Sequence, residues 1–66
     1  IAYKVSAADG QLSISGDYDN ATVYDAGGAV VGSASSDITL SHLPQGIYML
    51  RINSGGKVMV EKIVIR

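Results

Sequence analysis

The sequence contains no cysteine, no phenylalanine and no tryptophan, and it has one proline and one histidine among its 66 residues. Without cysteine, neither a disulfide nor a thiolate metal site can reinforce the fold. Without phenylalanine and tryptophan, aliphatic side chains and a few tyrosines must fill the core. At this length the chain forms at most one domain, which buries only about 60% of the surface that its unfolded form exposes. We therefore expect modest stability.

Charge is sparse as well, with a formal net charge of -1 and charged residues at 17% of the chain. Small soluble domains are typically about one quarter charged. The sequence has no basic stripe that would hold nucleic acid through its phosphates, so we expect no such partner. No apolar run approaches the roughly 20 residues of a membrane-spanning helix. Because the chain begins at Ile1, without a methionine or a signal peptide, we expect residues 1–66 to be a piece of a longer protein.

The last third of the chain predicts one long β-hairpin. Pro44 has a fixed φ and no amide hydrogen, so it ends any preceding ladder, and Gly46 gives freedom at the entry into the next run. Residues 48–53 then alternate between apolar and other side chains, which is typical of a half-buried strand. The glycines at 55–56 allow the positive φ values of a tight reversal, and residues 57–66 return as the second strand.

The alternation pattern changes along the returning strand. Val58 and Val60 set one phase. Ile63 and Ile65 set the other, and the change falls at Glu61-Lys62. Either a bulge there shifts the register, which is the commoner cause, or the final segment is covered on both faces. Because a free C-terminus is usually polar, this apolar end is either a tied-in strand or a segment that a partner grips.

The remaining sequence predicts short strands separated by turns. Asp9-Gly10 is a strong turn dipeptide, turn signals recur about every eight to twelve residues, and no window has apolar residues at helical spacing. The expected fold class is all-β, a small Ig-like antiparallel β-sandwich of about seven strands, since a thin aliphatic core does not line a ligand-holding barrel. The strands expected before the hairpin are 2–6, 11–15, 21–24, 29–31 and 37–40. The expected core comprises Leu12, Ile14, Val23, Val30, Ile38, Leu40, Leu43, Tyr48, Leu50, Ile52, Val58 and Val60.

Two groups of residues invite a chemical interpretation. Ser41 precedes the only histidine, His42, but adjacent residues of an extended segment point apart and would not form a nucleophile and its base. We interpret His42 as an exposed turn residue. Asp17, Asp19 and Asn20 offer oxygen atoms that calcium would accept. The glycine and the distal glutamate of the helix-loop-helix calcium pattern are missing, so a turn held by side-chain hydrogen bonds is favoured over a metal site.

Three further patterns also have structural interpretations. The tripeptide that starts at Asn20 matches the N-glycan acceptor pattern, which recurs by chance. The glycine pairs 27–28 and 55–56 lack the helix and the lysine of a phosphate loop, so we interpret them as turns. A carbohydrate-stacking platform is the alternative to a structural role for the tyrosines, which are Tyr3, Tyr18, Tyr24 and Tyr48. The sequence therefore predicts no catalytic residue, no metal site and no cofactor.

Two motifs at the end of the chain carry a resemblance to a known family. They are Leu-Pro-Gln-Gly-Ile-Tyr at residues 43–48 and Glu-Lys-Ile-Val-Ile-Arg at residues 61–66. With Val-Tyr-Asp at 23–25, they resemble the C-terminal sorting domain of type IX secretion cargo in Bacteroidetes. The resemblance covers about two thirds of the chain strictly and all of it loosely. Residues 1–15 lack the Pro-Asn-Pro opening of many members and are more similar to the opening of gingipain-type members.

The resemblance implies a seven-stranded domain that is an address and not an enzyme. In that family, cargo crosses the periplasm, the outer-membrane translocon and its shuttle protein recognise the domain, and a surface cysteine-protease sortase removes it. The cargo then stays on the cell surface or is secreted. Residues 1–66 would form one such C-terminal sorting domain, the end of a longer secreted protein. The family's recognition determinants correspond here to Pro44, Gly46, Tyr48, Lys57, Lys62, Ile63, Val64, Ile65 and Arg66.

The residues themselves favour the same interpretation, because an apolar terminal strand suits main-chain pairing with a partner. Deleting residues 63–66 is then expected to trap cargo in the periplasm while leaving its fold intact. The alternative function is a structural or carbohydrate-binding Ig-like accessory module of a surface protein, which would work without cleavage. An exposed edge strand also permits an edge-strand homodimer.

Overall fold

The computed structural model describes residues 2–66, which form seven β-strands. Within these residues no helix is long and apolar enough to cross a lipid bilayer. The strands are β1 (Ala2–Ala8), β2 (Gln11–Asp17), β3 (Asn20–Tyr24), β4 (Val30–Ala34), β5 (Ile38–Leu40), β6 (Gly46–Ser54) and β7 (Lys57–Ile65).

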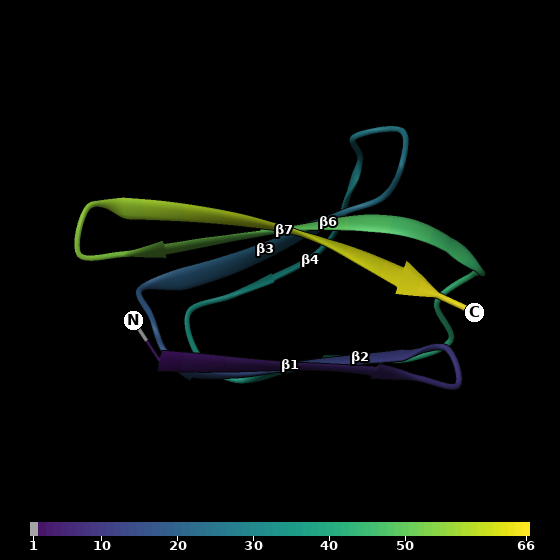
Figure 1. Cartoon of the computed structure of the whole chain (residues 1–66), viewed down its shortest axis with the longest axis horizontal. Helices are drawn as coiled ribbons and strands as arrows, with labels where there is room; N and C mark the ends of the chain where they lie inside the picture. Colours follow the sequence, from purple (N-terminus) through teal and green to yellow (C-terminus); the bar gives the residue numbers. More distant parts are fainter. Residues whose placement is uncertain (1) are drawn as a thin grey trace.

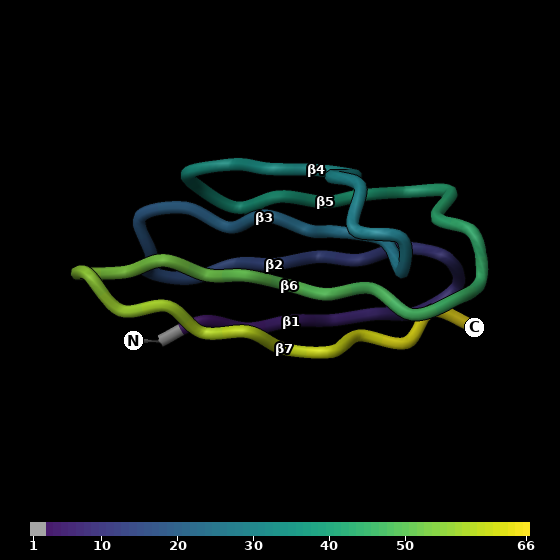
Figure 2. The backbone as a smooth tube through the Cα atoms, turned by 90° about the horizontal axis from the view of Figure 1, so that it is seen from above, coloured from purple at the N-terminus to yellow at the C-terminus, as the bar shows by residue number. Residues whose placement is uncertain are grey.

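The strands form two antiparallel sheets that lie face to face (Figure 1). One sheet has the order β1-β2-β5 and the other has the order β4-β3-β6-β7. Seen from above, the two sheets overlap, with β4 over β5 along one side of the molecule and β7 over β1 along the other (Figure 2). The predicted seven-stranded antiparallel sandwich is therefore confirmed.

Two tight reversals build the long hairpins because their residues accept positive φ angles. At the β1–β2 turn, Asp9 and Gly10 have φ values of +54° and +74°. At the β6–β7 turn, Gly55 and Gly56 have φ values of +56° and +80°. Positive φ at both central positions defines the type I′ turn, whose twist matches that of the flanking strands. The β6–β7 hairpin is long and extends beyond the start of β1 (Figures 1 and 2).

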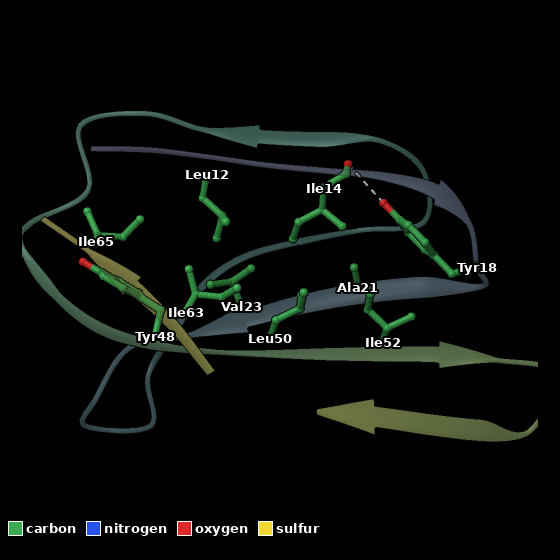
Figure 3. Packing of buried hydrophobic residues seen from close by; sticks show 10 residues of the cluster. All are labelled: Leu12, Ile14, Tyr18, Ala21, Val23, Tyr48, Leu50, Ile52, Ile63 and Ile65. Carbon is green, nitrogen blue, oxygen red and sulfur yellow. Dashed lines mark hydrogen bonds between the residues drawn. The ribbon is translucent and has the colours of Figure 1, made fainter. Parts of the chain in front are cut away.

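The core lies between the two sheets and is filled by side chains that alternate inward from both of them (Figure 3). It contains Leu12, Ile14, Tyr18, Ala21, Val23, Tyr48, Leu50, Ile52, Ile63 and Ile65. Six of the twelve predicted core residues lie in this cluster, and three more, Ile38, Leu40 and Leu43, are partly buried against it. Tyr18 was not expected in the core, and its hydroxyl donates a hydrogen bond to the Ser36 carbonyl oxygen at 2.8 Å.

Three predicted core residues are exposed instead. Val30 is 59% exposed, Val58 is 51% exposed and Val60 is 61% exposed. Their place in the register puts all three on the surface of the β4-β3-β6-β7 sheet that faces away from the other sheet, which we call the outer face. The prediction was wrong because both faces of this sheet carry apolar residues, and alternation alone does not tell which face is buried.

The predicted bulge at Glu61-Lys62 is also wrong. The β6–β7 register runs without interruption from the pair Gly46 and Ile65 to the pair Ser54 and Lys57. The apolar alternation along β7 changes phase because, near the turn, its valines occupy outer positions and its inner positions hold no core residue. Further along, the inner positions are Ile63 and Ile65, which lie in the core. The register shift in this sheet lies between β3 and β4, at Val23 and Tyr24.

Candidate functional site

Most of the predicted recognition residues meet at one end of the sandwich, where β6 begins and β7 ends. Gly46 pairs with Ile65, and Tyr48 pairs with Ile63. Lys62 lies further along β7, opposite Met49. Lys57 lies at the far end of the hairpin, beside the β6–β7 turn (Figure 1). The structure therefore gathers the end of the chain and the Pro44–Tyr48 segment into one region and leaves Lys57 outside it.

The Pro44–Tyr48 segment is fixed by local structure. The Tyr48 hydroxyl donates a hydrogen bond to the Pro44 carbonyl oxygen at 2.6 Å, and its ring is buried in the core. Gly46 has a φ of +155°, a conformation that other residues rarely adopt. These residues set the path by which the chain enters β6, and β6 in turn positions the last residues of β7.

Alternation along β7 divides the end of the chain between the core and the solvent. The side chains of Ile63 and Ile65 are 7% and 2% exposed and point into the core (Figure 3). Val64, between them, is 47% exposed and lies opposite Ile47 on the outer face. Lys62 is also exposed on that face. A partner that meets the folded domain can contact Val64 and Lys62, while the two isoleucines hold β7 in place.

The edge of β7 offers main-chain groups as well as side chains. β7 is the last strand in its sheet order. A two-residue turn closes with a hydrogen-bonded pair, here Ser54 and Lys57, and hydrogen-bonded pairs then alternate along the ladder. Asn53 agrees with this pattern, because its carbonyl oxygen faces β3 and accepts a hydrogen bond from the Asp19 amide at 2.8 Å.

The same alternation fixes the direction of the main-chain groups of β7. Every second residue directs its N–H and C=O groups away from β6 and toward the free side of the sheet. We call this row of main-chain groups the β7 edge. Its residues are Val58, Val60, Lys62 and Val64. The β7 edge is therefore a stretch of strand at which another strand can pair.

One side-chain contact ties β7 to the other sheet. The Tyr3 hydroxyl of β1 donates a hydrogen bond to Glu61 Oε2 at 2.8 Å. The hydrogen bond to Glu61, partial burial and the negative charge of Glu61 raise the pKa of Tyr3 above its ordinary value of 10.0. Glu61 lies on the inner side of β7, so this contact closes the sandwich without using the outer face.

Two open clefts flank the same end of the sandwich. One, of about 320 Å³, lies between the Asp9-Gly10 turn and the end of β7. The other, of about 270 Å³, lies between the β3–β4 turn and the Pro44–Tyr48 segment. Val64 lines the first cleft and Ile47 lines the second.

The other groups singled out in the sequence have structural positions. His42 is exposed and has a φ of +60°, as in a turn. Asp19 Oδ2 accepts a hydrogen bond from the Gly55 amide at 2.9 Å, and Asn20 Oδ1 accepts one from Asn53 Nδ2 at 2.7 Å. Both side chains are therefore engaged in holding the β6–β7 hairpin. Within residues 2–66, no three His, Cys, Asp or Glu side chains are grouped as a metal site would require.

The tyrosines do not converge on one surface. Tyr18 and Tyr48 are core residues, and Tyr3 bonds to Glu61 at the side of the sandwich. Tyr24 lies half-buried on the outer face, opposite Met49. The four rings therefore do not form a shared platform for a sugar.

Sequence reasoning missed the outer-face residues of β6, which lie next to the end of β7. Ile47, Met49 and Arg51 occupy this face, and Ile47 is 48% exposed. They alternate with the buried residues of the same strand, so the period-two pattern already placed them together. Only the structure shows that they form one surface with the β7 valines, which lie on the same outer face.

These features define a class of protein, a small β-sandwich that presents a strand edge and an apolar sheet face at its surface. Residues 6–66 match the family described as the secretion system C-terminal sorting domain. Because the match covers nearly the whole chain, the chain belongs to this family of type IX secretion sorting domains. The resemblance carried by residues 43–48 and 61–66 is thereby confirmed. Among curated proteins, no match to the chain was found.

Membership gives the general role of the domain. It is a sorting signal of the secretion system, so it belongs to a cargo protein and interacts with the machinery that carries this cargo to the cell surface or the medium. Sorting signals of this kind are not a class of enzymes.

Proposed function

We propose that the machinery selects its cargo by pairing main chain to main chain with the β7 edge of the folded domain. The observation that supports this proposal is the division of β7 between two roles. Ile63 and Ile65 anchor the strand in the core, while Val64 and the outward main-chain groups stay accessible. Strand addition at a sheet edge obtains affinity from main-chain hydrogen bonds and specificity from alternate side chains.

The proposal includes the fate of the cargo. The cargo crosses the periplasm, and the outer-membrane translocon and its shuttle protein bind the domain at the end formed by Pro44–Tyr48 and residues 62–66. A cysteine-protease sortase on the cell surface then cuts on the N-terminal side of the domain. The released cargo stays on the cell surface or enters the medium.

A proline substitution tests main-chain pairing directly. The amide of Val64 points away from β6, so Val64→Pro removes a hydrogen-bond donor from the β7 edge without removing one from the β6–β7 ladder. Val64→Ala trims the side chain and keeps the amide. We expect Val64→Pro to leave a fused reporter in the periplasm of a type IX-secreting strain, and Val64→Ala to reduce surface delivery only partly. Fractionation and immunoblotting of the reporter measure both.

Folding of the variants is checked by circular dichroism and urea unfolding of the purified chain. If a folded Val64→Pro variant is delivered to the surface as efficiently as wild type, the machinery does not recognise the domain through main-chain pairing at the β7 edge. The position and the occurrence of cleavage are measured separately, by the mass of the released reporter. An uncleaved reporter on the surface would contradict the sortase step alone.

A second copy of the chain would use the same edge. We include an edge-strand homodimer in the proposal as a competitor of recognition, because both events need the main-chain groups of the β7 edge. Sedimentation velocity over increasing concentrations measures dimer formation. A dimer that Val64→Pro does not weaken would form elsewhere on the molecule.

A further inference from the structure

The outer face of the β4-β3-β6-β7 sheet has unusually many exposed apolar side chains for a small soluble domain. All large apolar residues that are strongly exposed within residues 2–66 lie on it, with exposed fractions from 47% to 61%. Antiparallel sheets normally turn a polar face to water, and apolar patches of this kind mark interaction sites. The apolar residues of the outer face are Tyr24, Val30, Ile47, Met49, Val58, Val60 and Val64.

The other sheet of the same molecule follows the usual rule. Apart from Ala8, the described side chains on the surface of the β1-β2-β5 sheet that faces the solvent are polar or charged. These polar and charged residues are Lys4, Ser6, Gln11, Ser13, Ser15, Asp17 and Thr39. The apolar character of the outer face is therefore a property of one sheet and not of the composition of the whole chain.

The charges on the outer face are all of one sign. Arg51 lies opposite Val60, and Lys62 lies opposite Met49, so the two cations occupy diagonal positions, typically about 7–8 Å apart, in the middle of the apolar residues. The acidic residues of the described chain lie in connections, on β2 or on the inner side of β7. They are Asp9, Asp17, Asp19, Asp25, Asp37 and Glu61.

The positive charges on the outer face limit the kinds of partner that can bind there. A second copy docked face to face would bring Arg51 and Lys62 against like charges, which opposes association. Two cations attract an anionic lipid surface by only about 1 kcal/mol each. Helices that lie on membrane surfaces expose tryptophan, phenylalanine or leucine side chains, whereas the strongly exposed apolar residues here are four valines and one isoleucine. A protein segment with both apolar side chains and carboxylates can pack against the valines and pair with the two cations.

We propose that the outer face docks an apolar protein segment that carries acidic side chains, with its carboxylates placed against Arg51 and Lys62. This inference deepens the proposed function and rests on it, because the segment belongs to the machinery that reads the β7 edge. The two surfaces are continuous at Val64 and Lys62, which contribute main chain to the edge and side chains to the face. One partner can therefore pair with the edge and cover the face.

Photo-cross-linking in cells identifies what lies on this face. The photoreactive amino acid p-benzoylphenylalanine replaces Val60 in a reporter fused to the domain, in a type IX-secreting strain. Replacement of Ser13, on the polar face of the other sheet, is the matched control. We expect a protein adduct from position 60 and not from position 13. Mass spectrometry of the adduct should place the cross-link in a segment that combines apolar and acidic residues.

Charge reversal tests the role of the two cations. We expect Arg51→Glu with Lys62→Glu to lower the yield of the position-60 adduct about tenfold, which corresponds to about 1.4 kcal/mol. Lys4→Glu makes the same change on the other sheet and should leave the yield unchanged. Thermal unfolding of the purified variants confirms that the chain still folds, since all three positions are exposed.

Each contrary outcome overturns a defined part. Adducts of equal yield from positions 60 and 13, an adduct segment without acidic residues, or an adduct insensitive to charge reversal would overturn the inference. Co-sedimentation with phosphatidylglycerol vesicles that depends on Arg51 and Lys62, without a protein adduct, would assign the face to lipid instead. In all of these cases, a block of delivery by Val64→Pro would still support the proposed function. Normal delivery of a folded Val64→Pro reporter would contradict the proposed function itself.

Discussion

Three tyrosine hydroxyls stabilise this domain, each through a hydrogen bond. Two of them bond to connections that lead the chain from one sheet to the other, and the third joins the two sheets. Tyr48 bonds to Pro44 before β6, and Tyr18 bonds to Ser36 in the connection between β4 and β5. Tyr3 bonds across the sandwich to Glu61. In a core without phenylalanine or tryptophan, these rings supply both bulk and a directed hydrogen bond.

The Tyr3 contact predicts a specific dependence of stability on pH. Because the folded state raises the pKa of Tyr3 above 10.0, it holds the phenolic proton more tightly than the unfolded chain does. This contribution to stability is complete below the unfolded pKa and is lost as the pH rises through the raised pKa. We expect the free energy of unfolding of wild type to fall more steeply above about pH 10 than that of Tyr3→Phe. Urea unfolding across this range measures the difference.

Two variants sharpen that measurement. Glu61→Gln keeps an oxygen acceptor but removes the negative charge, so it should reduce the pH dependence without abolishing it. Tyr18, whose pKa is raised by burial and by the charge of Asp37, contributes a slope that remains in Tyr3→Phe. Equal slopes in wild type and Tyr3→Phe would show that the contact with Glu61 does not persist in solution.

At the scale of the element, the β6–β7 hairpin depends on its two-residue turn. Gly55 has a φ of +56°, and a Cβ atom added at this position would meet nothing within 4 Å. Asn-Gly is the preferred pair for a type I′ turn, and replacing glycine where the conformation fits reduces the entropy of the unfolded chain. We expect Gly55→Asn to stabilise the domain by about 0.5 kcal/mol. The urea midpoint at unchanged m-value measures this.

Gly55→Val is the matched control for the turn. It also reduces the freedom of the unfolded chain, but a β-branched side chain is strained at positive φ, so it should destabilise the domain. Both variants keep the backbone amide at position 55, which donates to Asp19 Oδ2 in the wild type, so this contact does not distinguish them. Destabilisation by Gly55→Asn as well would mean that the turn has another conformation.

The elements themselves could be predicted from the sequence, whereas the orientation of β7 could not. Turn residues such as Asp9-Gly10 and alternation in residues 48–53 depend on local chemistry, which sequence shows directly. Along β7, both faces carry branched apolar residues, so the pattern gives no sign of which face packs on the other sheet. The uninterrupted β6–β7 register, which is a tertiary property, resolves this and places Val58 and Val60 outside.

The candidate site was predictable in part for the same reason. The motifs at residues 43–48 and 61–66 predicted a site at one end of the molecule, and the structure brings them together there because they form neighbouring strands. Ile63 and Ile65 belong to the core as much as to the site, and only burial separates them from Val64. Arg51 was not singled out, since its neighbour Lys62 is distant in sequence.

At the scale of the whole molecule, the end of the chain is part of what keeps the domain folded. The molecule measures only 32 × 20 × 15 Å, and Ile63 and Ile65 are among the few residues of its core. Loss of a buried isoleucine typically costs about 2–5 kcal/mol. A domain of this length has a total stability of about 3–10 kcal/mol at typical values per residue. We therefore expect the domain to need its last residues in order to stay folded.

Truncation of the chain tests this dependence. We expect deletion of residues 63–66 to unfold most of the population, as measured by circular dichroism and urea unfolding of the purified chain. Deletion of Arg66 alone, which follows β7 and is exposed, should leave the free energy of unfolding within about 0.5 kcal/mol of wild type. If the longer deletion leaves the domain as stable as wild type, Ile63 and Ile65 do not support the core as described.

If the machinery recognises the β7 edge as proposed, the interleaving of buried and exposed positions along β7 also lets it distinguish folded from misfolded cargo signals. In a copy whose two sheets have not packed together, β7 is not held in place. Its main-chain donors and acceptors then form no ordered row with which a partner strand could pair. Recognition of the domain would then depend on a completed fold, so a misfolded export substrate would be rejected without a separate control step.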